Sequence, residues 1–340
     1  MKRVIVCGFG FMGQNHAANI LRCPDLELAA VVDPVPKSAV RPVRGNQNTS
    51  GPDPEKLRDI PFFTELSGAL EKGDADAVLI ATPVRFHARA ALAAVTAGKH
   101  VFVEKPLCSS LEEGAELQAA LRGKPLVFQV GHNVRFLKMY RMLGQFVREG
   151  AFGKLKALKL HRLTGTPDWG AWKELDVSLT SLSGPLFDLD IHDFDFALSL
   201  LGEPARTTAE RISGTDALFR TVWSYPGECE VVIEGGFTRP SSLPFRCGFA
   251  AVFERAVLEY DSRLGEKILL SGEAGCSEID CSSPDSSYYE ELLAFSSAMH
   301  RGTPVPCGLA EGLKALVICF RLKALLGKPL SSRFKKSGVL

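Results

Sequence analysis

The residues with the most specific chemistry are Gly8 to Gly13, with the sequence GFGFMG, directly after the short apolar run Val4 to Cys7. In a strand–turn–helix unit the first glycine permits a tight turn, the second lets the backbone approach a pyrophosphate, and the third lets the helix pack against the strand. Free N–H groups at the start of the helix then receive the phosphates. The residues predicted to bind a dinucleotide here are Gly8, Gly10, Phe11, Met12 and Gly13.

Asp33 ends the second apolar run, 20 residues after Gly13, where a dinucleotide site needs an acid to bind the ribose hydroxyls. Its carboxylate accepts a hydrogen bond from a 2′-hydroxyl group but repels a 2′-phosphate, so Asp33 favours NAD over NADP. Lys37, Arg41 and Arg44 follow closely and could pair with a phosphate instead, although a solvated basic loop has the same composition. We therefore expect NAD as the cofactor, with NADP possible.

A second group of candidate residues is Glu104-Lys105-Pro106, at the end of the apolar run His100 to Val103. Ligands bind at the carboxyl edge of open parallel sheets, where this strand would end. A lysine at that edge can polarise a substrate oxygen or take part in proton transfer. A surface ion pair between Glu104 and Lys105 would produce the same spacing, so both interpretations stay open.

A third group lies between Gly184 and Gly202, where Asp188 and His192 are four residues apart. On a helix this spacing places them on one face, one turn apart, and the apolar residues nearby predict that the helix is packed. A carboxylate beside an imidazole fixes the ring and suits it to act as a general base on a hydroxyl group. A purely structural histidine is equally compatible. A metal site is not predicted, because no further ligands stand at a recognisable spacing.

These side chains need strands that end at one edge of a sheet, and the first 130 residues predict such a sheet. Compact apolar runs alternate there with helical patterns, as they do where parallel strands are buried on both faces. The expected strands are Val4–Cys7, Leu28–Val32, Ala77–Ala81, His100–Val103 and Leu126–Val130. The expected helices are Gly13–Leu21, Thr64–Glu71, His87–Ala97 and Ser110–Arg122.

After Gly131 the pattern changes to longer stretches in which polar and apolar residues alternate, typical of an antiparallel sheet with one face in water. The expected strands are Leu155–Leu163, Ala217–Tyr225, Glu230–Phe237, Phe245–Phe253 and Ala256–Tyr260. The expected helices are Leu137–Glu149, Ser287–His300 and Leu309–Leu326. The fold class is therefore predicted as α/β, with a Rossmann dinucleotide-binding domain at residues 1–130 and an α+β domain at residues 131–340.

Composition places the chain among ordinary globular proteins. Its 340 residues, 46% of them hydrophobic and 23% charged, leave room for a sizeable core and exclude a disordered tail, a collagen-like fibre and a coiled coil. The net charge of +1 creates no overall field that would attract nucleic acid or an anionic membrane surface. We therefore expect neither as a partner.

Nine cysteines without a C-x-x-C pair are typical of reduced, buried thiols, which predicts a cytoplasmic protein. No apolar run approaches the roughly 18 residues of a membrane span. Lys2 and Arg3 precede an apolar stretch in the manner of a signal peptide, but the glycines of that stretch would interrupt it. A strand that runs into a tight loop explains these residues better.

Taken in order, these motifs resemble the glucose–fructose oxidoreductase, inositol dehydrogenase and MocA family over nearly the whole chain. The motifs that carry the resemblance are the glycine motif, Ala81-Thr82-Pro83 with His87, Ala97-Gly98-Lys99-His100-Val101, Glu104-Lys105-Pro106, Gly131-His132-Asn133-Val134-Arg135-Phe136, Asp188-x-x-x-His192-x-x-Asp195 and Tyr288-x-x-Glu291-Leu292-x-Ala294-Phe295. Pro185 and Asp190 depart from the pattern, because family members often carry glycine at these positions.

The resemblance implies a C-terminal domain built on a large, mostly antiparallel sheet, and a homodimer or homotetramer. It matches Lys105, Asp188 and His192 to the family's catalytic lysine, aspartate and histidine. The residues that would line the cofactor are Thr82, Pro83, His87, Glu104 and Lys105. The residues that would contact the substrate are Asn133, Arg135, Trp169, Trp172, Asp188 and His192. Packing is an alternative role for the two tryptophans.

The predicted function is an NAD(P)-dependent oxidoreductase that transfers a hydride between a sugar, cyclitol or related polyol and a nicotinamide cofactor. His192 would take the hydroxyl proton, and Lys105 would steady the charge on the reacting oxygen. Two alternatives stay open: a glycosidase-like enzyme that uses bound NAD for transient oxidation, and a catalytically silent regulator that responds to NAD. The presence of Lys105, Asp188 and His192 argues against the regulator, because a binding module needs no proton-transfer groups.

Overall fold

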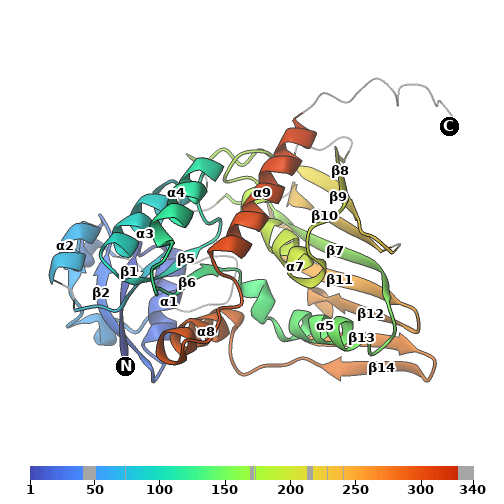
Figure 1. Ribbon diagram of the computed structural model, residues 1–340, viewed down its shortest axis with the longest axis horizontal. Coiled ribbons are helices and arrows are strands. Elements are labelled where there is room, and N and C mark those ends of the chain that lie inside the picture. Colours follow the sequence, from blue (N-terminus) through green and yellow to red (C-terminus); the bar gives the residue numbers. More distant parts are fainter. Residues whose placement is uncertain are drawn as a thin grey trace. The chain divides into compact units, whose positions relative to one another are not determined.

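The computed structural model describes residues 1–40, 51–72, 74–168, 172, 174–212, 217–227, 229–239 and 241–327 (Figure 1). They form two compact units, of which the first comprises Met1–Gln145 and Cys281–Leu316. The second comprises Phe146–Asp280 and the described residues from Val317 onward. The sequence assigns residues 1–130 to cofactor binding and residues 131–340 to substrate binding. This functional division stays a prediction.

The first unit is built on six parallel strands in the order β3-β2-β1-β4-β5-β6. The strands are β1 (Lys2–Cys7), β2 (Leu26–Val32), β3 (Phe62–Phe63), β4 (Ala77–Ile80), β5 (His100–Glu104) and β6 (Phe128–Gly131). Five of them follow the predicted apolar runs, because strands buried on both faces show no polar alternation. Only β3 has no counterpart among the predictions, since two residues form no pattern. The predicted α/β class with a Rossmann sheet is confirmed.

Helices cover both faces of this sheet (Figure 1). The helices that begin in the first unit are α1 (Phe11–Ile20), α2 (Leu66–Lys72), α3 (His87–Thr96), α4 (Leu111–Leu121), α5 (Lys138–Glu149), α8 (Ser287–Arg301) and α9 (Leu309–Leu326). α1 and α8 pack side by side on one face, and α2, α3 and α4 lie on the other. Among the helices described, none is long and apolar enough to cross a membrane.

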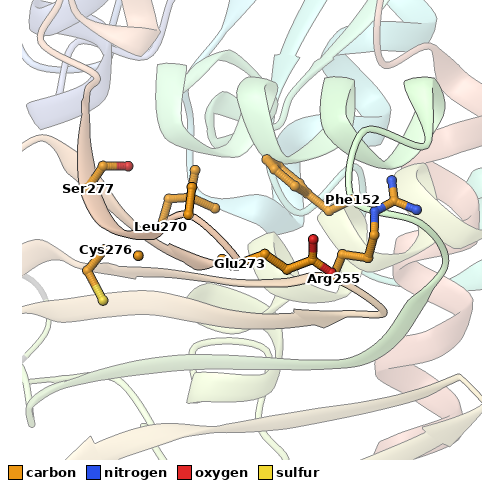
Figure 2. Close-up of a pocket in the computed structure, with 9 residues that line it drawn as sticks. Phe152, Arg255, Leu270, Glu273, Cys276 and Ser277 are labelled. Carbon is orange, nitrogen blue, oxygen red and sulfur yellow. The ribbon is translucent and has the colours of Figure 1, made fainter.

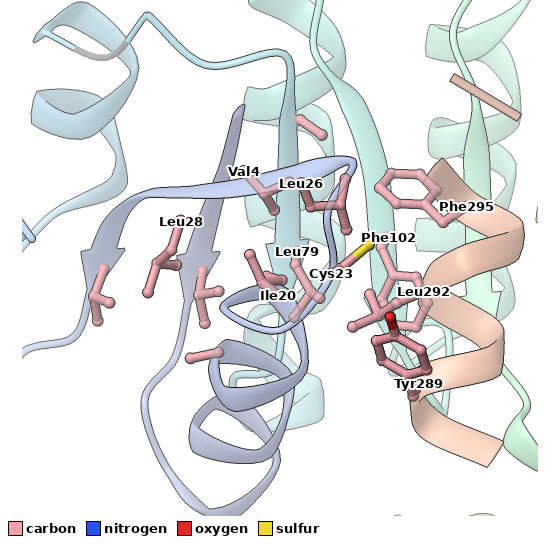
Figure 3. Packing of buried hydrophobic residues seen from close by; sticks show 14 of the residues in the cluster. Val4, Ile20, Cys23, Leu26, Leu28, Leu79, Phe102, Tyr289, Leu292 and Phe295 are labelled. Atoms are coloured by element: carbon pink, nitrogen blue, oxygen red, sulfur yellow. The ribbon is translucent and has the colours of Figure 1, made fainter. Parts of the chain in front are cut away.

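Helix α8 comes from the far end of the chain but forms part of the core of the first unit (Figure 3). Its Tyr289, Leu292 and Phe295 pack with α1 and with Leu79 and Phe102 of the sheet. The rings of Phe102 and Phe295 meet edge to face, with 5.7 Å between their centroids. The Rossmann core is therefore completed by a helix that lies outside its predicted sequence range.

The second unit is built on an eight-stranded sheet in the order β14-β13-β12-β11-β7-β10-β9-β8. Its strands are β7 (Leu155–Gly165), β8 (Arg206–Arg211), β9 (Leu218–Ser224), β10 (Glu230–Thr238), β11 (Arg246–Phe253), β12 (Ala256–Asp261), β13 (Lys267–Gly272) and β14 (Gly275–Asp280). β7 and β10 pair in parallel and all other neighbours are antiparallel, which confirms the mostly antiparallel sheet. The sequence does not predict β8, β13 and β14. β8 and β14 contain no buried residue, and β13 contains one.

Two short helices, α6 (Pro185–Asp188) and α7 (Ile191–Leu201), pack on β7 and β10 of this sheet. A buried ion pair fixes α7, since Arg162 of β7 donates from Nε and Nη2 to the two carboxylate oxygens of Asp193 at 3.2 and 2.8 Å. Asp190, between the two helices, is fully buried against β10. A Cβ atom built on Gly235 would lie 1.7 Å from Asp190 Oδ1, so the carboxyl group fills space that only glycine leaves.

This close contact predicts that Gly235→Ala lowers the free energy of unfolding by about 1–3 kcal/mol, the usual effect of overpacking a core. Asp190→Gly in the same chain removes the clashing carboxyl group and should recover most of that loss. Urea unfolding of the two single variants and the double variant measures this coupling. Gly272→Ala is the matched control, because the nearest atom to its Cβ lies at an ordinary 3.7 Å. Purely additive effects of Gly235→Ala and Asp190→Gly would contradict the packing described.

Candidate active site

The predicted cofactor residues gather at one edge of the parallel sheet. The glycine motif follows β1, Asp33 follows β2, and Thr82 and Pro83 follow β4. Glu104 is the last residue of β5, and Lys105 follows it. Because these strands run parallel, their carboxyl ends meet at the same edge of the first unit. This is the edge at which open α/β sheets bind ligands.

Each glycine of the motif has a distinct steric role. Gly8 has a φ of +92°, and its Cβ would lie 2.6 Å from the carbonyl of Ala81. A Cβ on Gly13 would lie 1.9 Å from the carbonyl oxygen of Gly8, so this position holds α1 close to the turn. Gly10, in contrast, has nothing within 4 Å of its Cβ position. The turn and the helix packing therefore require Gly8 and Gly13, whereas Gly10 leaves open space where a pyrophosphate would approach.

Asp33, at the end of the neighbouring strand β2, hydrogen-bonds to the glycine turn. The backbone N–H of Phe9 donates to its Oδ2 at 2.7 Å, and that of Val35 donates to its Oδ1 at 2.9 Å. Its side chain is only half-buried, and each carboxylate oxygen can accept a second bond. Lys37 is held away from such a role, because Nζ donates to the carbonyls of Arg58 and Ile60 at 2.6 and 3.1 Å. Arg41 and Arg44, the other candidates for a 2′-phosphate, lie outside the described residues.

His87 ties two loops of this edge together. It is 1% exposed, with Nδ1 2.8 Å from the carbonyl oxygen of Pro106 and Nε2 2.7 Å from that of Thr82. Burial lowers the pKa of His87 below its ordinary value, although both carbonyls act in the opposite direction. A neutral imidazole carries one N–H and donates to one carbonyl at a time. The observed contacts of His87 therefore position the loops after β4 and β5.

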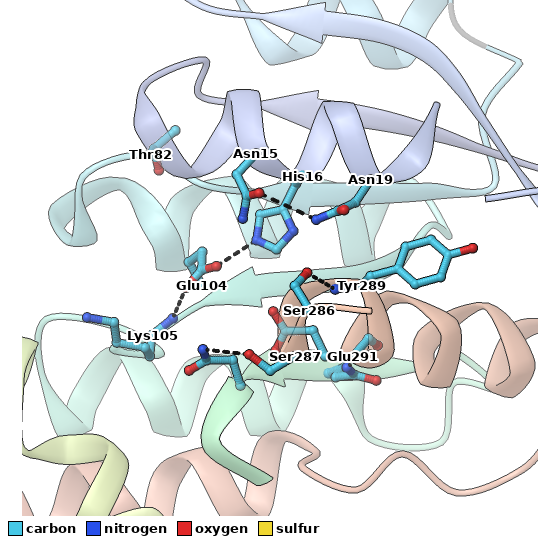
Figure 4. A network of polar contacts seen from close by, with 12 residues as sticks. Asn15, His16, Asn19, Thr82, Glu104, Lys105, Ser286, Ser287, Tyr289 and Glu291 are labelled. Atoms are coloured by element: carbon cyan, nitrogen blue, oxygen red, sulfur yellow. Dashed lines mark hydrogen bonds and ion pairs between the residues drawn. The ribbon is translucent and has the colours of Figure 1, made fainter. Parts of the chain in front are cut away.

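The Glu104–Lys105 pair is not a surface ion pair, because Glu104 is buried at 6% exposure and Lys105 is half-buried. His16 Nε2 lies 2.6 Å from Glu104 Oε1, and the backbone N–H of Lys105 donates to Glu104 Oε2 at 3.2 Å (Figure 4). Burial alone would raise the pKa of Glu104, but the hydrogen bond and charge of His16, with Lys105 and His87, hold it below the ordinary value. Glu104 is thus a buried carboxylate directly beside the candidate catalytic lysine.

Two residues of this cluster have no assigned role in the sequence-based reasoning. His16 of α1 and Glu291 of α8 are both fully buried, and one ligand atom from each of His16, Glu104 and Glu291 lies within 4.8 Å of the others. The run of polar residues at the buried start of α1 is the only sequence signal for His16. Its partners are 88 residues and more away along the chain, so no local spacing reveals the cluster.

Asn133 and Arg135, predicted to contact substrate, make contacts within the first unit. Asn133 Nδ2 donates to Ser287 Oγ at 3.2 Å, and Arg135 Nη1 donates to the carbonyl of Pro306 at 2.6 Å. Asn133 is also 9% exposed, whereas Arg135 is half-buried. Both side chains therefore help to attach the segment after β6 to the C-terminal part of this unit.

Asp188 and His192 belong to the second unit, and the continuous helix predicted for them is wrong. Asp188 ends α6 and His192 is the second residue of α7, with Leu189 and Asp190 between the helices. Backbone N–H groups of both Asp193 and Phe194 donate to the carbonyl of Asp190, which starts the second helix there. Asp188 and His192 are both half-buried. The Arg162–Asp193 ion pair fixes the turn that carries His192.

Asp190 adds a second buried carboxyl group to this segment. Burial, followed by the charge of Asp193, raises its pKa well above the ordinary value, although the guanidinium of Arg162 opposes this. Neither of its oxygens hydrogen-bonds to a described residue. Burial therefore favours the protonated form of Asp190, whereas Arg162 and Asp193 form an ion pair next to it.

The two tryptophans lie in the second unit as well. Trp172 is half-buried and packs edge to face on Phe237, with 6.5 Å between ring centroids. Trp169 lies outside the described residues. The observed contact of Trp172 is therefore a packing contact with Phe237.

A surface pocket of about 310 Å³ lies at the β13–β14 end of the eight-stranded sheet (Figure 2). Phe152, Arg255, Glu273 and Cys276 contribute to its lining. None of the predicted site residues lines this pocket. We assign it no role.

Comparison with known proteins places the chain among oxidoreductases. The model of the oxidoreductase family with an NAD-binding Rossmann fold matches residues 2–132, and that of the GFO/IDH/MocA C-terminal domain matches residues 140–250. These are the two parts of the family that the sequence motifs resemble, so that prediction is confirmed.

Individual relatives agree over most of the chain. The chain is 25% identical to myo-inositol 2-dehydrogenase of Thermotoga maritima, over 98% of this chain and 99% of that protein. It is 31% identical to inositol 2-dehydrogenase 4 of Saccharopolyspora erythraea, over 69% of this chain and 72% of that protein. The structure of levoglucosan dehydrogenase with NADH and levoglucosan is similar in fold, with a TM-score of 0.78, 19% identity and coverage of 95% and 96%.

The glycine geometry separates a structural role from a binding role. Gly13→Ala should lower the thermal midpoint, because its methyl group would overlap the Gly8 carbonyl. Gly10→Ala should leave that midpoint unchanged but weaken NAD binding by roughly tenfold, which corresponds to about 1.4 kcal/mol. Thermal unfolding and NAD titration followed by protein fluorescence measure both effects. A Gly10→Ala variant that binds NAD as tightly as the wild type would exclude a pyrophosphate beside Gly10.

Proposed function

Because the chain belongs to the GFO/IDH/MocA oxidoreductase family, with an NAD-binding Rossmann fold, we propose that it is a dehydrogenase of sugars, cyclitols or related polyols. The observation that carries the proposal is the gathering of the glycine turn, Asp33 and the Glu104–Lys105 pair at one sheet edge. Relatives named as inositol dehydrogenases support the substrate class. When bound, the nicotinamide cofactor supplies the hydride acceptor.

In this proposal the proton and the hydride leave the substrate by separate routes. His192 takes the proton of the reacting hydroxyl group as a general base, and Asp188 orients the imidazole. The Lys105 ammonium group donates to the substrate oxygen and stabilises the charge that develops there. The buried carboxylate of Glu104 holds the backbone of Lys105, which supports a fixed position for that charge. The substrate contacts predicted for Asn133, Arg135 and Trp172 stay predictions.

We also propose a preference for NAD over NADP. The half-buried carboxylate of Asp33 stands at the end of β2, where it would repel a 2′-phosphate. Lys37, the described basic residue nearest to it in sequence, is engaged by two backbone carbonyls. The contacts of Asp33 and Lys37 therefore both favour the cofactor without the phosphate.

The glycosidase-like alternative and the silent regulator are less well supported. The relatives are named as dehydrogenases, and the lysine, aspartate and histidine of the family pattern all stand in this chain. Net NADH production from a free polyol distinguishes a dehydrogenase from an enzyme that cleaves a glycoside without net redox change. A regulator would neither produce NADH from a free polyol nor cleave a glycoside.

The protein is further proposed to act in the cytoplasm as a homodimer or homotetramer. All nine cysteines are free thiols and seven of them are buried, which fits a reducing compartment. The oligomeric state follows from the family resemblance, and light scattering of the purified protein would measure it.

If His192 is the base, His192→Asn should keep the fold and NAD affinity but lower kcat by roughly 10²–10⁴-fold, the usual contribution of a positioned acid–base group. The ionisation that limits kcat/KM for alcohol oxidation at low pH should disappear in the same variant. Stopped-flow and steady-state NADH formation across pH measure both effects. A variant with near-normal turnover and an unchanged pH profile would make His192 a packing residue and move the role of base to Lys105.

The role of Asp33 predicts that Asp33→Ser narrows or reverses the preference for NAD over NADP, because it removes the charge that opposes the 2′-phosphate. Titration of both cofactors into the wild type and the variant measures the ratio of dissociation constants. Asp25→Ser, a change of the exposed aspartate just before β2, is the control for loss of a negative charge. Equal or tighter NADP binding by the wild-type protein would contradict this assignment.

A further inference from the structure

Two carboxyl groups lie close together inside the first unit. Glu104 ends β5 at 6% exposure, and Glu291 of α8 is 0% exposed. Together with His16 of α1, also 0% exposed, they offer ligand atoms that all lie within 4.8 Å of one another. Figure 4 shows these side chains converging from the three elements. The catalytic roles proposed for Lys105, Asp188 and His192 make no use of Glu291.

The contacts within this cluster are typical of hydrogen-bonded side chains rather than of the ligands of a metal ion. His16 and Glu104 are in direct hydrogen-bonding contact at 2.6 Å, which leaves no room for an ion between them. Both oxygens of Glu104 accept hydrogen bonds, from His16 and from the backbone of Lys105, as expected for a carboxylate. Neither oxygen of Glu291 hydrogen-bonds to a described residue. Ionisation of both buried carboxyl groups at this separation is strongly disfavoured in the absence of a further positive charge, which favours a proton on Glu291.

The groups around the pair come from every element packed against it. His16 faces both carboxyl groups from α1, and Lys105 and His87 act on Glu104 from the sheet edge and from α3. Among the described residues, neutral side chains also contact the cluster: Phe102 and Tyr288 pack on the His16 ring, and Gln129 Nε2 donates to the main-chain carbonyl of Glu291 at 2.8 Å. Burial and the charge of Glu104 raise the pKa of Glu291 well above its ordinary value, consistent with a protonated acid.

The surroundings also prevent Glu104 from moving away from the pair. Gly131, its partner on β6, leaves room for the carboxyl group, since a Cβ there would lie 3.3 Å from Glu104 Oε2 and 3.2 Å from Cε1 of Phe102. The carboxylate is held by its hydrogen bonds to His16 of α1 and to the backbone of Lys105, and it packs closely against β6. A positive charge brought to the sheet edge beside Lys105 would act on a fixed, poorly solvated anion, where electrostatic interactions are strong.

We propose that Glu291 holds a proton beside the ionised Glu104 and that binding of the oxidised nicotinamide cofactor at the adjoining sheet edge releases this proton to solvent. The inference rests on the proposed function, since it needs a nicotinamide cofactor at this edge. The oxidised ring carries one positive charge that the reduced ring lacks. That charge stabilises the doubly ionised pair, so the protonated protein and NAD⁺ give the NAD⁺ complex, with both carboxylates ionised, and one proton. NADH binding releases no proton from the pair.

The test compares dissociation constants for NAD⁺ and NADH between pH 6 and 9, followed by protein fluorescence. In the wild type, NAD⁺ should bind more tightly as the pH rises, by at least roughly threefold over the range and at most about tenfold per pH unit for one released proton. NADH affinity should change less. Calorimetry of NAD⁺ binding in two buffers of different ionisation enthalpy measures the released proton directly.

Glu291→Gln keeps the shape of a neutral acid and removes the proton, so its NAD⁺ affinity should lose this pH dependence. Glu290→Gln, on the same helix in an exposed ion pair with Arg141, is the matched control and should behave as the wild type. A Glu291→Gln variant with the wild-type pH dependence would overturn the inference. If that variant does not fold, absence of proton release from the wild type on NAD⁺ binding overturns it instead. Failure of the wild type to bind either cofactor form would overturn the proposed function as well, which distinguishes the two.

Discussion

The hydrogen bond between His16 and Glu104 is the interaction on which the candidate cofactor site depends most. It joins α1, whose start forms the glycine turn, to the end of β5, where Glu104 also accepts from the backbone of Lys105. A buried anion is stable only when its partners stay in place, so this bond fixes the helix and the lysine relative to each other. One buried contact thereby fixes the positions of the start of α1, which would face the phosphates, and of Lys105, which would face the reacting oxygen.

The second unit also contains buried charged groups, which hold α7 on the sheet. Arg162 and Asp193 neutralise each other through two hydrogen bonds, while burial raises the pKa of Asp190 beside them. The pair attaches the first turn of α7 to β7, and Asp190 fills the space above Gly235. In both units a carboxyl group whose pKa is raised by burial lies next to a carboxylate that is held by a cationic or hydrogen-bonding partner.

Local patterns predicted most of the fold, because they report directly on burial. The glycine motif with Asp33 predicted the turn and the cofactor edge, and Leu309–Leu326 is the range of α9 in the structure. Exposed strands such as β8 and β14 lack a buried apolar run and gave no signal. The helix expected around Asp188 and His192 is broken at Leu189 and Asp190, because spacing alone carries no information about a turn between two helices.

The cluster of His16, Glu104 and Glu291 could not be predicted for a different reason. Its members are far apart in the sequence, and each has an ordinary local setting: a helix, the end of a strand and a second helix. Only the packing of α8 on α1 and the sheet brings the two carboxyl groups together. Contacts between elements that are distant in the sequence produce no periodic pattern in the sequence, so they cannot be predicted from it.

The most direct test of the proposed activity is a panel of free cyclitols, aldoses and sugar acids, followed by nicotinamide absorbance with NAD and NADP in parallel. We expect NADH formation with at least one polyol, in proportion to the carbonyl product and faster than NADPH formation. Tight binding of NAD without oxidation of any free polyol, together with cleavage of a glycoside and no net NADH, would contradict it.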